Sequence, residues 1–335
     1  MARRAWLLTV SLEGDRLPHS MAAPTVRLPN FFLAGVAKAG TTSLNAYLSQ
    51  HPQVFMSRNK EPWFFGTADL LAPPYDDSVL AALQRDRAWL QTYLEGPQEP
   101  DVWRYVMEWD DYVRLFRDAR DEPVIGEAST GYFWLPSAAG AIRAKLPDAR
   151  FAFMLRDPAD RLFTLYLLNL WRAPRISFRE WFRSALETPQ WWPSIVGAGQ
   201  YATHLERWGG IWPRERMRIY LYDDYRADPH AILRDLFEFL EVQPDFPISL
   251  ARRHNETTVP RFQHLHALRQ RMFAGAALPA WFPEGARRAL QGLYRRARAD
   301  VTMDPADRRM AVDYYRDEIE RTAALIGRDL SAWLR

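Results

Sequence analysis

Cysteine is absent from this chain of 335 residues, and lysine is scarce. The lack of cysteine excludes disulfide bonds, thiolate nucleophiles and zinc sites with cysteine ligands. Lysine occurs only at Lys38, Lys60 and Lys145 among 44 basic residues, so arginine carries nearly all of the positive charge. Two of the three, Lys38 and Lys60, lie in or near a loop bounded by Gly35 and Gly40.

Long apolar runs are also missing. The run near the start, Ala5 to Val10, is too short to span a membrane and is a poor secretory signal. We therefore expect residues 1–25 to be a disordered leader and the protein to be cytoplasmic. Hydrophobic residues at 48% and charged residues at 25% are typical of a folded globular chain. The net charge of +3 and the lack of a recognition motif give no indication of a nucleic-acid partner.

Short apolar runs alternate with longer amphipathic ones from residue 31 onward. Each short run is bounded by polar, glycine or proline residues, which is typical of strands. The predicted strands are Phe31–Gly35, Val54–Ser57, Val124–Glu127, Arg150–Leu155 and Met217–Tyr222. The predicted helices are Thr42–Gln50, Leu80–Leu94, Tyr105–Ala119, Ser137–Lys145, Pro158–Trp171, Ile176–Trp192, Gln200–Gly209 and Pro229–Leu240.

This alternation predicts a three-layer α/β fold like that of P-loop NTPases, with a central and mainly parallel sheet of about five strands. Beyond Pro260 the pattern becomes all-helical, with clear segments at Pro283–Arg298 and Pro305–Ile326. We therefore expect a single domain over residues 26–335. It would consist of an α/β core at 26–258 and a helical C-terminal subdomain, or cap, at 259–335.

The segment after the first predicted strand has the features of a phosphate-binding loop. An apolar strand, a glycine-bounded turn and a helix direct backbone N–H groups and the positive end of a helix dipole at one point. The loop differs from the pattern G-x-x-x-x-G-K-[ST], because Thr41 takes the place of the lysine and Lys38 lies inside the loop. It predicts a phosphate-like ligand other than ATP, held in part by a compact ammonium group.

A second anion-binding segment begins where the fourth predicted strand ends. Asp157 is placed to cap the following helix and Pro158 fits its first turn, so Arg156 lies at the strand terminus. There its guanidinium can hold a phosphate through two hydrogen bonds, with Thr164 two turns into the helix. The alternative is that Arg156 pairs with Asp160 and that Thr164 bonds back to its own helix.

With two further segments, Arg58–Phe65 and Gly126–Phe133, these features resemble the sulfotransferases that use 3′-phosphoadenosine 5′-phosphosulfate (PAPS). The resemblance is to the carbohydrate-directed type, related to heparan sulfate sulfotransferases and their bacterial relatives. In that family a G-x-x-K-x-G-T-[ST] loop binds the 5′-phosphosulfate, and its positions are occupied here by Lys38, Ala39, Gly40, Thr41, Thr42 and Ser43. The resemblance implies that Arg156 and Thr164 hold the 3′-phosphate.

The resemblance also implies the catalytic groups. Transfer of a sulfuryl group to a hydroxyl needs a base near that hydroxyl and a cation where charge develops on the leaving phosphate oxygen. Glu61 is the implied base and Lys38 the implied cation. Glu127, at the end of the third strand, is a rival base or a carboxylate that positions the acceptor. The alternative for Glu61 is a surface charge pair with Lys60.

Three positions near the candidate bases depart from the family pattern. Trp63 and Gly66 stand where members often carry histidine and aspartate, and Ala128 stands where they usually carry a lysine that contacts the acceptor or the phosphosulfate. The departures leave the acceptor contacts open and make Glu127 a rival to Glu61. Arg261 falls where members close a basic loop over the 3′-phosphate, which makes it a further candidate ligand.

A metal ion is not expected. His254, His264 and His266 fit no zinc spacing, and the implied mechanism draws its positive charge from protein cations and loop dipoles. The expected partners are PAPS and a carbohydrate or small molecule that carries a hydroxyl.

Two other functions compete with sulfation. A P-loop small-molecule kinase would use the same fold, but the misplaced lysine and the lack of an evident Walker-B aspartate argue against it. A non-catalytic binder of acidic glycans would use the basic end of the chain, where residues 251–335 hold 16 arginines against 10 acidic residues.

Overall fold

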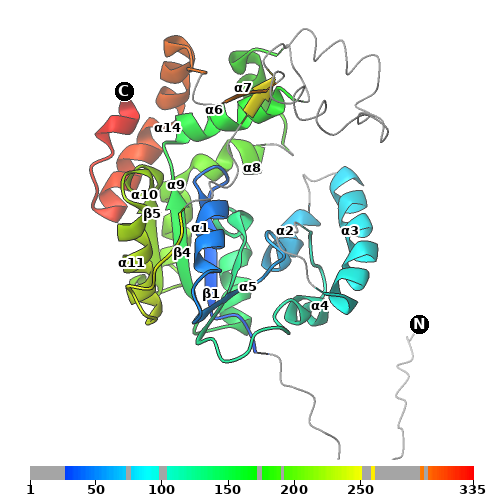
Figure 1. The fold of residues 1–335 in the computed structure, drawn as a ribbon. Coiled ribbons are helices and arrows are strands. Elements are labelled where there is room, and N and C mark those ends of the chain that lie inside the picture. Colours follow the sequence, from blue (N-terminus) through cyan, green and yellow to red (C-terminus); the bar gives the residue numbers. More distant parts are fainter. Residues whose placement is uncertain are drawn as a thin grey trace, which may run out of the picture.

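The computed structural model describes residues 27–72, 77–97, 104–171, 176–189, 192–250, 258–260, 295–297 and 301–335. The expected leader at residues 1–25, the candidate ligand Arg261 and the three histidines at 254, 264 and 266 lie outside these ranges. Within them, five parallel strands form a central sheet with helices on both sides (Figure 1). The predicted α/β fold with its central parallel sheet is confirmed.

The strands follow the predicted segments closely. They are β1 (Phe31–Gly35), β2 (Val54–Met56), β3 (Val124–Ala128), β4 (Arg150–Leu155) and β5 (Met217–Leu221), in the spatial order β2-β3-β1-β4-β5. All residues of β1 and β3 are buried, as expected for parallel strands covered on both faces. The order reverses at β1, which pairs with β3 on one side and β4 on the other. Ligands of such sheets bind at the carboxyl ends of the strands beside this switch point.

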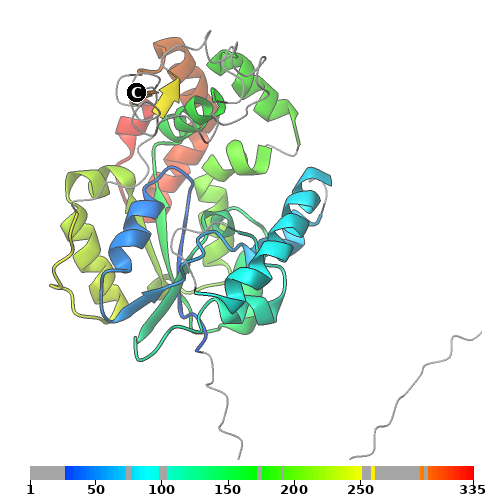
Figure 2. The same ribbon diagram turned by 45° about the vertical axis from the view of Figure 1, so that its right-hand side comes forward.

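The helices form the two outer layers of the fold (Figures 1 and 2). On one side lie α1 (Thr41–Leu48), α10 (Tyr222–Ala227) and α11 (Pro229–Leu240), and on the other lie α5 (Ala138–Lys145) and α9 (Tyr201–Gly209). On the α9 side, the rings of Trp208 and Trp212 pack edge-on against Phe151 at centroid distances of 4.9 and 4.6 Å. The other helices are α2 (Thr67–Leu70), α3 (Asp77–Glu95), α4 (Trp109–Arg114), α6 (Pro158–Asn169), α7 (Phe178–Glu187), α8 (Trp192–Ile195) and α14 (Pro305–Ile326).

Two predicted helices are shorter than expected. The helix predicted over Tyr105–Ala119 is reduced to α4, because the chain at residues 104–106 is extended and bonds to another segment, with the N–H of Val106 donating to the carbonyl of Pro62 at 2.8 Å. The helix predicted over Ile176–Trp192 ends at Glu187, and the separate helix α8 follows. Pro193 fits the first turn of a new helix, which favours this break.

The expectation of an all-helical chain beyond Pro260 is wrong at one place. Arg295–Ala297, the end of the helix predicted over Pro283–Arg298, forms strand β7 and pairs antiparallel with β6 (Thr258–Pro260). The arginines there favour a helix locally, but pairing of backbone groups with a distant segment prevails over intrinsic propensity.

The C-terminal helix α14 has the predicted bounds. It begins after the capping side chain of Asp304 and ends at Gly327, whose φ of 64° suits glycine. It packs against the core, since the hydroxyl of Tyr315 donates to the carbonyl of Val196 at 2.8 Å and Thr203 bonds Glu318 at 2.7 Å. Among the described residues, no helix combines the length and the apolar character that a bilayer crossing requires.

Candidate active site

The loop between β1 and α1 presents backbone donors at the carboxyl edge of the sheet. Gly40, with φ 87°, is the N-cap of α1, and no side chain caps the first turn of the helix. The first N–H groups of α1 are thus left for a ligand. Lys38, two residues earlier, also has a left-handed backbone, with φ 72°. Left-handed residues in a short loop turn successive N–H groups toward one side and form a concave site for an anion.

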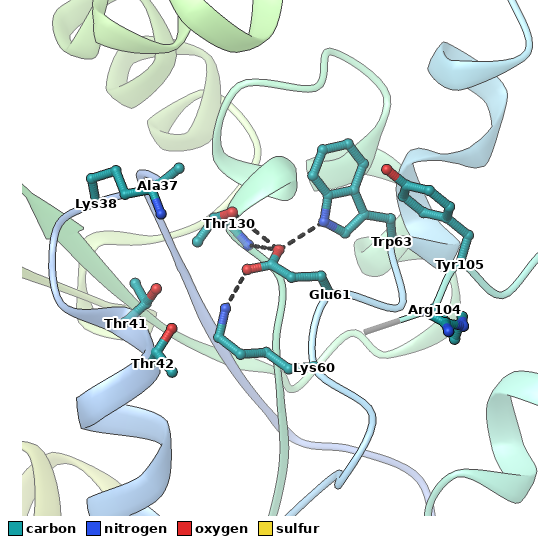
Figure 3. A pocket seen from close by; sticks show the side chains of 10 residues that line it. All are labelled: Ala37, Lys38, Thr41, Thr42, Lys60, Glu61, Trp63, Arg104, Tyr105 and Thr130. Carbon is teal, nitrogen blue, oxygen red and sulfur yellow. Dashed lines mark hydrogen bonds and ion pairs between the residues drawn. The ribbon is translucent and has the colours of Figure 1, made fainter. Parts of the chain in front are cut away.

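A cavity of about 400 Å³ lies in front of this loop. In Figure 3, Lys38, Thr41 and Thr42 stand on one side of it, Trp63 and Tyr105 on the other, and Glu61 between them. The complete lining is Ala37, Lys38, Thr41, Thr42, Lys60, Glu61, Trp63, Arg104, Tyr105 and Thr130. The fold therefore brings the predicted base and the predicted loop cation to one space, although they come from different segments.

The carboxylate of Glu61 is held by four donors. Its Oε2 accepts from the indole Nε1 of Trp63 at 2.7 Å, from the backbone N–H of Thr130 at 2.7 Å and from the Thr130 hydroxyl at 3.0 Å. Its Oε1 pairs with the ammonium of Lys60. The Lys60 side chain is only 3% exposed, so this is a buried ion pair and not the surface pair that the sequence left open.

Positive charge is concentrated around the loop. Burial lowers the pKa of Lys38, and the nearby charges of Lys60 and Arg156 lower it further, against the opposing effect of Glu61. Crowded, partly desolvated cations destabilise one another when no anion lies between them. The arrangement therefore favours a ligand that brings negative charge to Lys38 and Lys60.

Glu127 lies on β3 and is fully buried. Its Oε1 accepts from the hydroxyls of Tyr112 and Tyr132 at 2.8 and 2.9 Å, and its Oε2 accepts from Ser129 at 2.7 Å. Burial raises the pKa of Glu127 to about 7, with a further contribution from the charge of Glu61, and the three hydrogen bonds oppose that rise. Glu127 does not line the cavity, and it supports the β3 end that carries Ser129.

Arg156 and Thr164 lie behind the loop and do not line the cavity. Nη1 of Arg156 donates to the carbonyl oxygen of Lys38 at 2.8 Å, and Nη2 lies 3.8 Å from the carboxylate of Asp160. The hydroxyl of Thr164 bonds the carbonyl of Asp160 at 2.8 Å. Arg156 and Thr164 therefore make the contacts expected if they do not bind phosphate: an ion pair with Asp160 and a bond back to the helix. Binding of a 3′-phosphate by these residues stays a prediction.

The other predicted loop residues have local roles. Ala39 is fully buried, and Gly40 provides the turn into α1. Ser43 has a hydrogen bond with Tyr225 and is not part of the cavity wall.

Six lining residues were not candidate site residues from the sequence: Ala37, Lys60, Trp63, Arg104, Tyr105 and Thr130. Lys60 had a usable signal, since it is one of three lysines and adjoins Glu61. Arg104 and Tyr105 had no such signal in the sequence, because hydrogen bonds with the side chain of Asn59, in another segment, hold them at the site. That amide accepts from the N–H of Arg104 at 3.0 Å and donates to its carbonyl at 2.9 Å.

A comparison with known families identifies the family of this chain. The chain matches the group described as "Sulfotransferase family" over residues 29–247, which includes every residue that lines the cavity. The chain belongs to the sulfotransferase family. A solved structure titled as a sulfotransferase from Alicyclobacillus acidocaldarius is 28% identical, with a TM-score of 0.65, and the likeness covers 92% of this chain and 100% of that one.

This sulfotransferase also resembles curated proteins from animals. Bifunctional heparan sulfate N-deacetylase/N-sulfotransferase 4 of Mus musculus is 23% identical over 321 residues, covering 92% of this chain and 31% of the relative. Carbohydrate sulfotransferase 15 of Homo sapiens is 23% identical over 261 residues, covering 65% of this chain and 44% of the relative. The chain spans less than half the length of either relative. In the described ranges, no group of three or more histidine or acidic residues has the arrangement of a metal site.

Proposed function

We propose that this sulfotransferase moves the sulfuryl group of PAPS to a hydroxyl of a carbohydrate or small-molecule acceptor. The observation that carries the proposal is the cavity that Glu61 shares with Lys38, Thr41 and Thr42 of the loop after β1. Sulfuryl transfer needs a base and an electrostatic clamp on opposite sides of the reacting sulfur, and we assign these two roles to Glu61 and to the loop.

In the proposed reaction, Glu61 takes the proton from the acceptor hydroxyl as its oxygen attacks sulfur. The bond between sulfur and the bridging phosphate oxygen breaks, and 3′-phosphoadenosine 5′-phosphate (PAP) leaves. Lys38 neutralises the negative charge that develops on the leaving oxygen, and the N–H groups from Gly40 to Ser43 hold the 5′-phosphate. The contact of Lys38 with the leaving oxygen strengthens as charge develops there, so it lowers the barrier more than it strengthens binding. No metal ion takes part in the proposed mechanism.

The 3′-phosphate is assigned to Arg156 and Thr164. Arg156 is anchored at the carboxyl end of β4, and its guanidinium lies 4.7 Å from the ring centre of Tyr222. To bind a phosphate, Arg156 would exchange its long contact with Asp160 for a stronger, charge-assisted one. The assignment of Arg261 to the same phosphate stays a prediction from the sequence.

Between the two carboxylates, we assign the base to Glu61. Glu61 lines the cavity, whereas Glu127 is fully buried and has a donor on each oxygen. A general base must come within hydrogen-bond reach of the proton that it removes. We assign Glu127 to the support of the β3 end, next to Ser129 and Thr130.

A carbohydrate acceptor is favoured by two observations. The curated relatives are named for heparan sulfate and for carbohydrate sulfation. The acceptor side of the cavity is walled by the rings of Trp63 and Tyr105, whose centroids lie 5.5 Å apart at an angle of 70°. Such rings can pack against the face of a sugar, and they also accept flat phenols.

The test combines ligand binding with an acceptor screen. Thermal unfolding should shift upward with PAP and not with ATP and Mg²⁺, since binding to the folded state alone raises its stability. ³⁵S-labelled PAPS should then transfer label to at least one member of a panel of polysaccharides, glycolipids and phenols. Stabilisation by ATP with Mg²⁺ but not by PAP would favour a kinase and overturn the proposal. Binding of heparin without any effect of PAP would favour a glycan binder instead.

A further inference from the structure

Trp63 contributes one of three hydrogen bonds to a single oxygen of Glu61. The donors to Oε2 are the indole Nε1 and the backbone and hydroxyl of Thr130. A carboxylate oxygen has two lone pairs, so Oε2 has no remaining capacity for an acceptor hydroxyl. Within the described ranges, the partner of Oε1 is Lys60, so this oxygen retains a lone pair that can accept a further proton donor.

Trp63 and Glu61 both have strained backbone conformations, and these conformations hold the indole in contact with the carboxylate. Among the described residues other than glycine, only Lys38, Glu61, Trp63 and Glu241 have positive φ, at 72°, 61°, 53° and 61°. Glu241 is the C-cap of α11, where a left-handed residue is common. The other three all line the cavity. Strained residues persist when their surroundings fix them, and they gather at functional sites.

The surroundings of Trp63 are built to fix its indole. A Cβ on Gly131 would lie 2.8 Å from an indole carbon, so glycine is needed there for the ring to fit. The rings of Tyr105 and Trp134 meet the indole edge-on, at centroid distances of 5.5 and 5.7 Å. The N–H of Glu61 donates to the carbonyl of Ala128 at 2.8 Å, which fixes the other end of the turn.

We propose that Trp63 is a positioning residue that holds the Glu61 carboxylate so that Oε1 is the atom that takes the proton. A histidine at this position could supply the same hydrogen bond, because the Nε2 of histidine has the place in its five-membered ring that Nε1 has in indole. This inference rests on the proposed sulfuryl transfer.

Several charged or titratable groups share the environment of the carboxylate. Lys38 lies on the loop after β1, Lys60 precedes Glu61, Glu127 lies on β3, and Arg104 and Tyr105 lie across the cavity. Trp63→Phe neither removes nor adds a charge in this set. A change in its rate therefore reports on the orientation and hydrogen bonding of the carboxylate.

The test uses water as the acceptor, because the natural acceptor is not needed to examine the base. In PAPS hydrolysis, water attacks sulfur, its proton passes to Glu61, and PAP and sulfate are released. Trp63→Phe keeps an aromatic wall and removes the donor. Trp63→His restores a donor. Trp212→Phe is the matched control, since it also removes an indole donor, to the carbonyl of Ala139 at 3.1 Å, and Trp212 does not line the cavity.

We expect Trp63→Phe to lower kcat for hydrolysis by about tenfold or more, the value of a hydrogen bond to a charged group, with KM for PAPS and PAP affinity unchanged. Trp63→His should recover much of the rate, and Trp212→Phe should keep it.

The outcomes separate this inference from the proposed function. If the wild-type protein binds PAP and hydrolyses PAPS while Trp63→Phe matches it in kcat, the role of Trp63 is wrong and the proposed function stands. If Trp63→His is as slow as Trp63→Phe although both bind PAP, the hydrogen bond is not what matters and the inference also fails. If the wild-type protein neither binds PAP nor consumes PAPS, the proposed function fails and the inference fails with it.

Discussion

Nη1 of Arg156 donates to the carbonyl oxygen of Lys38 at 2.8 Å. This bond joins the end of β4 to the loop after β1, so the two segments predicted to hold the two phosphate groups of PAPS act on one another. It also fixes the orientation of the carbonyl group of Lys38, whose backbone is left-handed, with φ 72°. A change at Arg156 is therefore expected to affect the loop conformation as well as any direct contact with a phosphate.

Arg156→Ala should separate these two effects when two nucleotides are compared. If Arg156 holds the 3′-phosphate, affinity for PAP should fall by about 10-fold to 100-fold, as expected for a charge-assisted contact. Affinity for 5′-AMP, which lacks that phosphate, should fall much less. Calorimetry with both nucleotides measures the difference, and Arg218→Ala on β5 is a control arginine away from the loop. An equal loss for both nucleotides would mean that Arg156 acts only through the loop.

Lys38→Met should lower the rate of PAPS hydrolysis without lowering the stability of the folded protein. Burial is the main reason that the pKa of Lys38 is lowered, so the free protein gains little from this ammonium group. We expect an unfolding temperature equal to or above that of the wild-type protein without ligand. PAPS hydrolysis should fall by about 100-fold or more, because a cation at the leaving oxygen is lost. Unchanged hydrolysis together with a lower unfolding temperature would contradict both parts.

Glu61→Gln and Glu127→Gln should differ in their kinetics. Removing a general base is expected to lower turnover by about 10²-fold to 10⁴-fold, so Glu61→Gln should bind PAP normally and turn over PAPS very slowly. Glu127→Gln should retain most of the activity, since an amide can replace the buried carboxylate with similar shape. Hydrolysis rates and PAP titrations of both variants decide the matter. The reverse order of rates would assign the base to Glu127.

Glu127 should make the fold less stable as the pH rises toward neutrality. Its pKa is raised to about 7 in the folded protein from 4.5, so the folded chain holds the proton more tightly over this interval. The unfolded state binds fewer protons there, and the free energy of unfolding falls as pH rises from about 4.5 to about 7 and then levels off. The full effect is on the order of 3 kcal/mol.

Denaturant unfolding at several pH values measures this effect as a difference between proteins. Between about pH 5 and about pH 7, the free energy of unfolding of the wild-type protein should fall more than that of Glu127→Gln. Parallel curves for the two proteins would show that Glu127 does not titrate in this range.

Much of the fold could be read from the sequence because its signals are local. Each buried strand is an apolar run with polar or glycine ends, and α6 begins at Asp157 and Pro158, where the aspartate accepts from two backbone N–H groups as predicted. The loop at Lys38 and Gly40 was visible for the same reason, since glycine spacing and a rare lysine need no partner to be recognised. The prediction failed at Arg295–Ala297, where pairing with β6 replaced a helix.

The class of fold, the glycine-bounded loop after β1 and the position of a carboxylate beside Lys60 could all be predicted from the sequence alone. Which groups share a cavity depended on the tertiary structure, which buries Glu127 among Tyr112 and Tyr132 and brings Tyr105 and Trp63 across from the loop. The difference arises because helices, strands and turns follow from contacts between near neighbours in the chain. Burial and hydrogen bonding of a side chain depend on segments that the sheet order brings together from far apart.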